Sequence, residues 1–271
     1  MIPKVIHYCW FGGASKSAFI KKCMQTWKEK MPDYQIKEWN ETNFNFQEFP
    51  FIKSAYEQKK WAFVADYVRL YVLYTEGGIY MDTDVKVMKG FDEFLKYDFF
   101  SANEIHPFFF EKSEQNKINP QTYQPYNPNE FIHGFGILSA IMGSRAGLPY
   151  LKDCIDYYKS LNFDLKHCNI NDYVIGKHIT RLILKYGYQF LDKNQLLKDN
   201  MMILESKYLV GNAIYLKKDS YAIHLCNGSW TDNANTFNDK FRNNYPSIYP
   251  IYGFILRVIN KLKRIFQTFI I

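Results

Sequence analysis

The chain has 271 residues, 47% of them hydrophobic and 18% aromatic, enough for one large α/β domain or a domain with a small addition. No apolar run reaches the roughly 18 residues that a membrane-spanning helix needs. The first residues also lack the basic start of a secretory signal. The five cysteines contain no Cys-x-x-Cys pair, which favours reduced thiols over a disulfide framework or a zinc site.

The net charge of +7 is unevenly distributed along the chain. Residues 240–271 hold six of the 34 Lys and Arg residues and none of the 27 Asp and Glu residues. Residues 1–239 are therefore almost neutral, and this distribution gives no support for nucleic-acid binding by the body of the protein.

The first 40 residues predict a strand, a helix and a second strand. An apolar run over 2–11 is expected to form a buried strand that stops at Gly12-Gly13, where glycine lets the backbone approach a ligand closely. Ser15 or Ser17 is placed to cap the helix that follows, and residues 34–39 alternate as a second strand. This order is the opening of a doubly wound α/β fold.

Two helices are predicted next, over 51–60 and 61–76, and the second is almost wholly apolar. Asp66 and Arg69 lie three residues apart within it, so they share a helix face. Burying unpaired charges is costly. The two residues are therefore expected either to form a salt bridge that ties the helix to its neighbours or to hold a polar ligand.

The run Gly77–Val87 is the centre of the prediction. Its two glycines end the apolar helix, a buried strand follows, and Asp82 and Asp84 come at the end of that strand. In an extended chain, residues two apart point to the same side, so both carboxylates would face one point. Hard divalent cations take such oxygen ligands, and open α/β sheets bind ligands at the carboxyl ends of strands. The alternative is a polar turn.

The rest of the chain continues the mixed pattern. A short helix at 91–95 and a strand at 99–103 precede residues 104–130, where the periodicity vanishes; a loop of that length is typical of a functional or mobile segment. His224 ends a predicted strand and is either a structural residue or a ligand. Further strands are expected at 136–144, 201–209 and 221–225, and further helices near 147–160 and 171–186.

Residues 251–271 predict a basic amphipathic helix. At about 100° per residue, the basic and polar side chains between Arg257 and Thr268 fall in one arc, and Phe, Ile, Leu and Val fill the opposite arc. This composition is typical of an anchor that lies in the plane of a membrane surface. A helix packed on the domain or in an oligomer contact is the alternative, but neither needs a polar face of one sign.

Four segments, taken in order, resemble glycosyltransferase family 32, the Asp-x-Asp (DXD) sugar transferases of bacterial surface-polysaccharide synthesis and of fungal Golgi mannosylation. They are residues 2–13, 62–70, 77–84 and 224–230. The chain is similar, more distantly, to the catalytic domain of the clostridial glucosylating toxins. The resemblance implies a GT-A fold, in which helices flank a Rossmann-like mixed central sheet. It also implies sugar transfer from a nucleotide donor with retention at the anomeric carbon.

The resemblance also implies a nucleotide pocket. Trp10 should stack on the base, and the backbone near Cys9 should contact the edge of the base. Asn40 or Asn43 should line the same pocket. Trp230 should approach the leaving group as part of the closing motif near the end of the chain.

A second group of residues is implied to act on the donor sugar and the diphosphate. Asp66 and Arg69 should hold the sugar, and Asp82 should contact the ribose or the sugar. Asp84 should ligate Mn²⁺ or Mg²⁺, with His224 near the metal or the diphosphate. Asp66, Arg69, Asp82 and Asp84 are therefore the predicted catalytic set, and a metal with cationic helpers would stabilise the departing diphosphate.

The sequence departs from the family pattern on the acceptor side. Gly176 is followed by Lys177 where many relatives have proline, and residues 205–210 lack an expected tyrosine-proline pattern. A metal role for Glu205 therefore stays open. Residues 104–130 are the candidate for acceptor selection.

Two other functions fit parts of the sequence. A haloacid-dehalogenase-type phosphohydrolase also begins with a strand followed by Asp-x-Asp, but that class carries the motif near the chain start. A catalytically silent sugar-binding or membrane scaffold of the same fold is the second alternative.

The sequence thus predicts a GT-A catalytic domain over 1–245 and a basic amphipathic helix over 246–271. We expect a retaining, metal-dependent hexosyltransferase that uses a UDP- or GDP-sugar and a glycan or lipid-linked oligosaccharide acceptor in capsule or lipopolysaccharide synthesis. With no second carboxylate evident as a nucleophile, front-face displacement is the expected mechanism. The basic tail predicts a cytoplasmic enzyme held peripherally on the anionic inner face of the cell membrane.

Overall fold

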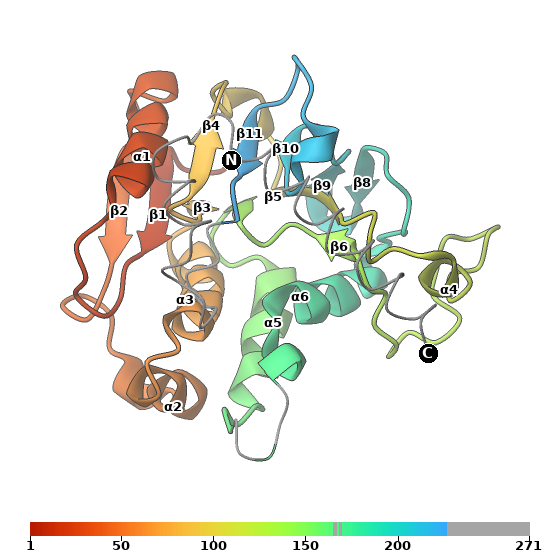
Figure 1. Cartoon of the computed structure of the whole chain (residues 1–271), viewed down its shortest axis with the longest axis horizontal. Helices are drawn as coiled ribbons and strands as arrows, with labels where there is room; N and C mark the ends of the chain where they lie inside the picture. The colour runs from red at the N-terminus through yellow and green to blue at the C-terminus, as the bar shows by residue number, and fades with distance from the viewer. Residues whose placement is uncertain (165–166, 168–169, 227–271) are drawn as a thin grey trace, which may run out of the picture.

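The computed structural model describes residues 1–164, 167 and 170–226. A large mixed sheet lies at the centre of the molecule (Figure 1). Its strands, in spatial order, are β2 (Gln35–Trp39), β1 (Val5–Cys9), β3 (Gly78–Met81), β7 (Ile141–Ser144), β5 (Phe99–Ile105), β9 (Met201–Leu204) and β8 (Gln195–Leu197), with β6 (Phe135–Ile137) paired to β5. The predicted fold class is confirmed: this is an α/β protein in which helices flank a mixed central sheet.

Strand direction gathers polar residues at one edge of this sheet. Strands β1, β2, β3, β5 and β9 run parallel, while β6, β7 and β8 run against them. The carboxyl ends of the five parallel strands therefore meet at one edge, as in other open α/β sheets. The residues that end or follow these strands there are Trp10, Asn40, Asp82, Glu104 and Glu205.

A small second sheet and six α-helices complete the described fold. The small sheet contains β10 (Leu209–Val210), β11 (Ala222–His224) and β4 (Val85–Val87). The α-helices are α1 (Ala18–Lys30), α2 (Pro50–Glu57), α3 (Trp61–Thr75), α4 (Lys112–Gln115), α5 (Pro149–Lys159) and α6 (Ile175–Ile183). Short 3₁₀ helices cover Phe46–Glu48, Asp92–Phe94, Ile170–Tyr173, Leu184–Tyr186, Lys198–Asn200 and Ala213–Tyr215.

Two hydrophobic layers hold these elements on the sheet. Helices α2, α3, α5 and α6 cover one face, and α1 covers the other together with the small sheet (Figure 1). Strand β3 serves both layers because side chains alternate along a strand. Tyr80 packs into the helical layer, whereas Ile79 and Met81 pack against the layer that contains Trp27 of α1.

Most elements predicted from the sequence are confirmed. The helices expected at 51–60 and 61–76 are α2 and α3, and the expected opening is β1, α1 and β2. Ser17, one of the two proposed caps, accepts a hydrogen bond from the Ile20 backbone N–H through its hydroxyl. Four cysteines lie in the described part of the chain, and all four are free thiols.

Two predicted strands are each interrupted. The strand expected over 136–144 is two strands, β6 and β7, and the strand expected over 201–209 ends at Leu204 before β10 begins in the other sheet. The Ser101 hydroxyl lies at the first break, where its single proton is shared between the carbonyls of Leu138 and Ile141, at 2.7 and 3.1 Å. A buried side chain thus satisfies backbone groups that the ladder leaves unpaired.

None of the helices in the described ranges is long and apolar enough to span a membrane. The predicted tail helix, the boundary at residue 245 and Trp230 all lie outside the described residues.

Two glycines shape the start of the central strand. Gly77 and Gly78 have φ of +70° and +105°, which side-chain-bearing residues rarely adopt. A Cβ on Gly78 would lie 2.7 Å from the Val5 carbonyl oxygen and 2.8 Å from His7 Nε2. His7 is itself fixed, since Nε2 donates to the Gly77 carbonyl at 2.8 Å and Nδ1 accepts from Trp39 Nε1 at 3.0 Å.

Replacing Gly78 by alanine should therefore destabilise the protein strongly. Gly187 is a matched control because its φ is +99° and nothing lies within 4 Å of its Cβ position. We expect Gly187→Ala to cost about 1–2 kcal/mol from backbone strain alone. Gly78→Ala should cost about 1–3 kcal/mol more because the strand backbone must also move. Urea unfolding measures both, and equal losses would contradict the close packing at Gly78.

Candidate active site

The Asp82-Thr83-Asp84 segment is a tight turn between the two sheets. The Val85 N–H donates to the Asp82 carbonyl at 3.0 Å, so the chain reverses here. The prediction of an extended segment at this point is wrong because the chain must leave β3 in the large sheet and enter β4 in the small one. The prediction that the two carboxylates converge is nevertheless met, through the turn.

His224 is brought to this turn by strand pairing. In the small sheet His224 is the register partner of Val85, and the Leu225 N–H donates to the Asp84 carbonyl at 3.1 Å. The imidazole Nε2 consequently lies 3.3 Å from Asp84 Oδ1 and 3.9 Å from Asp82 Oδ2. Residues far apart in the chain thus face the same point.

These three side chains form a group that fits a divalent cation. One ligand atom from each of Asp82, Asp84 and His224 lies within 4.8 Å of the others. Two carboxylate oxygens and one imidazole nitrogen suit Mn²⁺, and the carboxylates also suit Mg²⁺. Three protein ligands leave coordination positions for phosphate oxygens or water. The two predicted metal ligands, Asp84 and His224, therefore lie together, and Asp82 lies close enough to be a third ligand.

Arg69 places a buried positive charge beside the turn. Its guanidinium lies 2.7 Å from Asp66 Oδ1 and 3.4 Å from Asp82 Oδ1, and it donates to the Ser139 carbonyl at 2.9 Å. It also stacks over the Tyr80 ring, whose hydroxyl donates to Asp82 Oδ1 at 2.9 Å. The salt-bridge alternative for the Asp66–Arg69 pair is confirmed, and the pair lies beside Asp82. The alternative that the pair holds a polar ligand stays a prediction.

The break between β6 and β7 supplies two of these contacts. The Ser139 carbonyl accepts from Arg69, and the neighbouring Ala140 carbonyl accepts from the Asp82 N–H at 2.9 Å. Ser139 and Ala140 lie between β6 and β7, and neither residue belongs to the strand pairing of β6 with β5 or of β7 with β3. The interruption that the sequence did not predict therefore holds both the arginine and the DXD turn.

Burial shifts the proton affinities of this cluster. The low dielectric around Asp66 raises its carboxyl pKa to about 7, and the Asp82 charge adds to that effect while Arg69 opposes it. Burial disfavours the imidazolium of His224, but its contacts with Cys226 and with the Asp84 carboxylate outweigh that effect and raise its pKa. A metal ion on His224 would displace that proton.

The residues predicted for the nucleotide lie along the ends of β1 and β2. The Trp10 indole donates to the Ala14 carbonyl at 2.6 Å, and Lys16 lies over its ring at 4.9 Å. Burial raises the pKa of the Cys9 thiol, so this thiol is neutral. Asn40 and Asn43 hydrogen-bond mainly within their own loop: Asn40 accepts from Thr42, and Asn43 donates to the Glu38 carbonyl.

A polar cluster at the end of β5 was not singled out from the sequence. Glu104 Oε1 lies 3.3 Å from His106 Nε2, and the Asn212 amide lies 3.4 Å from His106 Nδ1. Burial would raise the pKa of Glu104, but His106 and the nearby His224 outweigh it and lower that pKa, so the carboxylate is charged at neutral pH. Glu104 lies near the end of an apolar strand, just as Asp82 follows one, and this is the signal that would have found it.

Glu205 lies apart from the metal ligands. Its carboxylate pairs with Lys207 at 2.9 Å, and in the described part of the chain it belongs to no group that could hold a metal ion. The segment 104–130 contains the end of β5, helix α4 and an isolated bridge between Ile118 and Pro125. It is therefore more ordered than its composition predicted.

The raised pKa of Asp66 predicts a pH-dependent stability. Its carboxyl binds a proton more tightly when folded (about 7) than at the ordinary value of 3.8, so the folded state gains most when this group is protonated. The unfolding free energy of the metal-free protein, relative to Asp66→Asn, should fall as pH rises from about 4 to 7 and then level off. Urea titrations in EDTA measure it, and a difference that rises with pH would contradict burial as the dominant influence on this carboxyl.

The comparisons with known proteins agree with this geometry. Residues 17–101 match the family model described as the glycosyltransferase sugar-binding region containing a DXD motif. Over 103 residues the chain is 30% identical to inositol phosphoceramide mannosyltransferase 3 of Schizosaccharomyces pombe, covering 35% of this chain and 28% of that protein. It is also 30% identical over 103 residues to the initiation-specific alpha-1,6-mannosyltransferase of Candida albicans, covering 34% and 27%.

Two solved structures also resemble the fold. PaToxG glycosyltransferase aligns over 68% of this chain and 69% of its own, with 17% identity and a TM-score of 0.47. A glycosyltransferase involved in glycosylation of the major capsid of PBCV-1 aligns over 83% and 94%, with 10% identity and a TM-score of 0.40.

The chain spans less than a third of the length of either mannosyltransferase that it matches. The region matched by the family model contains two of the four segments on which the predicted assignment depended, 62–70 and 77–84, and with them the Asp66–Arg69 pair and both aspartates of the turn. The predicted resemblance is confirmed for this region: residues 17–101 match the family model of a glycosyltransferase sugar-binding region that contains a DXD motif.

Proposed function

We propose that the whole chain is a metal-dependent glycosyltransferase that moves a hexose from a UDP- or GDP-sugar to a glycan or lipid-linked oligosaccharide. One observation carries this proposal: the ligand atoms of Asp82, Asp84 and His224 converge beside the buried Arg69–Asp66 pair. The names of the two relatives, both mannosyltransferases, support a hexose as the transferred group.

Each side chain of the cluster has a task in that reaction. A bound Mn²⁺ or Mg²⁺ would supply positive charge to the diphosphate as it leaves. Asp84 and His224 would hold the cation, and Asp82, which accepts from Tyr80, would join them. Arg69 is fixed by Asp66 and Ser139, which leaves its charge oriented toward the donor without further reorganisation. Trp10 offers an aromatic face at the end of β1 for the base.

We propose retention by front-face displacement, with Glu104 on the acceptor side. Its ionised carboxylate ends β5 at the sheet edge where Asp82 follows β3, and its pKa is lowered by His106 first and also by His224, against the opposing effect of burial. A charged carboxylate there can accept the proton of an acceptor hydroxyl or stabilise a cationic sugar.

Glu104→Gln should lower sugar transfer by roughly 10²-fold while metal-dependent donor binding stays intact, because the amide cannot take the proton. Glu205→Gln is the matched control, since Glu205 follows the neighbouring strand β9 but pairs with Lys207. Initial rates and donor titrations separate the two effects. A glycosyl adduct on Glu104, detected by mass spectrometry, would contradict front-face displacement and make this residue a nucleophile.

Donor turnover tests the proposed function itself. The assay is cleavage of a nucleotide-sugar panel, led by GDP- and UDP-hexoses, with and without Mn²⁺. We expect metal-dependent cleavage of one donor, reduced by about 10²-fold or more in Asp84→Ala because the metal loses a ligand. Asp219→Ala, an exposed aspartate away from the site, is the control. Absence of both cleavage and donor binding would favour the silent scaffold, and phosphate release from a simple monoester would favour the phosphohydrolase.

We also propose that the enzyme works at the cytoplasmic face of the cell membrane in the synthesis of a surface polysaccharide. The support is the sequence of residues 251–271: its charged residues are all basic, and the helical pattern puts them with uncharged polar residues on one face, opposite an apolar face. Attraction to anionic lipid would add to burial of the apolar face.

Deleting residues 251–271 should release the protein from anionic vesicles and leave turnover of a water-soluble acceptor unchanged. High salt should weaken vesicle binding of the full chain because surface charges are screened. Co-sedimentation with vesicles of anionic and neutral lipid measures both effects. Equal vesicle binding by the full and shortened chains would contradict the anchor.

A further inference from the structure

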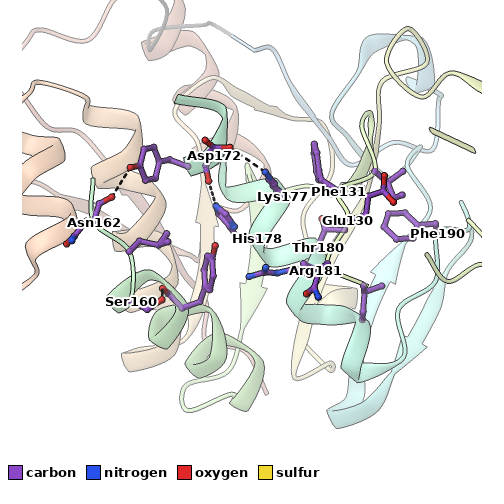
Figure 2. Close-up of a pocket in the computed structure, with 16 residues that line it drawn as sticks. Glu130, Phe131, Ser160, Asn162, Asp172, Lys177, His178, Thr180, Arg181 and Phe190 are labelled. Atoms are coloured by element: carbon purple, nitrogen blue, oxygen red, sulfur yellow. Dashed lines mark hydrogen bonds and ion pairs between the residues drawn. The ribbon is translucent and has the colours of Figure 1, made fainter. Parts of the chain in front are cut away.

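A cavity of about 480 Å³ lies among the helices α5 and α6. It is formed by the end of α5, by α6 and by residues 129–132, which precede β6. Figure 2 shows Ser160 and Asn162 on one side of this cavity, Glu130 and Phe131 on the other, and the charged face of α6 between them. Its volume is within the range of small-molecule sites.

The lining combines aromatic faces with hydrogen-bonding side chains. Tyr157 and Phe131 border the cavity, and each lies beneath a cation: Arg181 is 4.7 Å from the Tyr157 ring centroid, and Lys177 is 5.7 Å from that of Phe131. Residues with amide, hydroxyl and carboxylate side chains also line the cavity. Sugars present both kinds of surface, with apolar C–H faces that pack on rings and hydroxyls that need directed partners.

Arg181 gives the cavity an available donor. In the described residues its guanidinium stacks on Tyr157 and makes no ion pair with a carboxylate. Lys177 lies 3.7 Å from Asp172, and Glu130 lies 3.2 Å from Lys117. The neighbouring His178 has a pKa lowered to about 4 by burial, so it adds no positive charge at neutral pH. The charges around the cavity therefore nearly balance, which favours a neutral ligand over a polyanion.

We propose that this cavity binds a carbohydrate chain through Tyr157, Phe131 and Arg181. The site is distinct from the DXD cluster and binds glycan without a metal. Resting on the proposed function, the glycan is the acceptor, held at sugar units remote from the unit that receives the new sugar.

Strand β6 joins the two sites. Gly136 of β6 is the register partner of Glu104 in β5, and the Thr180 hydroxyl of α6 accepts from the neighbouring Ile137 N–H at 2.9 Å. A Cβ on Gly136 would meet that hydroxyl at 2.6 Å, so α6 packs directly on the strand. Glycan bound between α5 and α6 is therefore one strand away from the proposed acceptor carboxylate, and its end can continue around the sheet edge.

Glycan binding can be measured independently of catalysis. The full-length Asp84→Ala protein in EDTA is titrated with fluorescently labelled mannan, glucan and galactan oligosaccharides, short and long, by fluorescence polarisation. We expect at least one class to bind, with affinity that rises with chain length. Adding Arg181→Ala should weaken this binding by about tenfold, because the site loses its directed donor. Lys185→Ala, one turn farther along the chain and outside the cavity lining, should bind as its parent does.

The outcomes separate this inference from the proposed function. Binding that survives in Asp84→Ala, falls with Arg181→Ala and is unaffected by Lys185→Ala supports the site even if no donor turns over. Failure of every oligosaccharide to bind, or equal binding by Arg181→Ala, overturns it. Competition by inorganic diphosphate but not by unlabelled glycan also overturns it, in favour of an anion site. Thermal unfolding of each variant confirms that it is folded, and Arg181→Lys tests whether charge alone suffices.

Discussion

The structure depends on how it accommodates like charges at the end of a buried strand. Asp82 and Asp84 repel each other in a partly dry environment, and an opposite charge nearby lowers that cost. Arg69 supplies such a charge to Asp82, and the protonated imidazole of His224 supplies one to Asp84. A divalent cation neutralises both carboxylates more fully, which is why this cluster suits a metal–diphosphate substrate.

Three separate parts of the fold hold this cluster in place. Helix α3 carries the arginine and its aspartate partner, and the large sheet delivers the DXD turn through β3. The small sheet brings His224 from the far end of the described chain by pairing β11 with β4. The carbonyls freed between β6 and β7 accept from Arg69 and from the Asp82 N–H. In the proposed reaction, a buried arginine with this many fixed partners would be preorganised for the charge of the departing diphosphate.

Much of the site could be predicted because its residues follow local rules. The aspartates follow a buried strand, and Asp66 and Arg69 stand out as charges within an apolar helix. The remainder depends on pairing between distant segments, which local patterns do not record. The tight turn at Asp82 corresponds to the polar-turn alternative, which local pattern could not separate from an extended strand end, and the break beside Ser101 has no sequence signal of its own. Glu104 was missed because the following residues lose their periodicity, although β5 extends through it.

The most direct measurement is the coupling between Mn²⁺ and a nucleoside diphosphate. Isothermal titration of GDP and UDP into the full-length protein, with and without Mn²⁺, reports whether both occupy one site. We expect Mn²⁺ to tighten the binding of either GDP or UDP about tenfold or more. Asp84→Asn should abolish this tightening while the protein stays folded. Equal affinity with and without the metal, or unchanged coupling in Asp84→Asn, would contradict a metal–diphosphate site at the DXD turn.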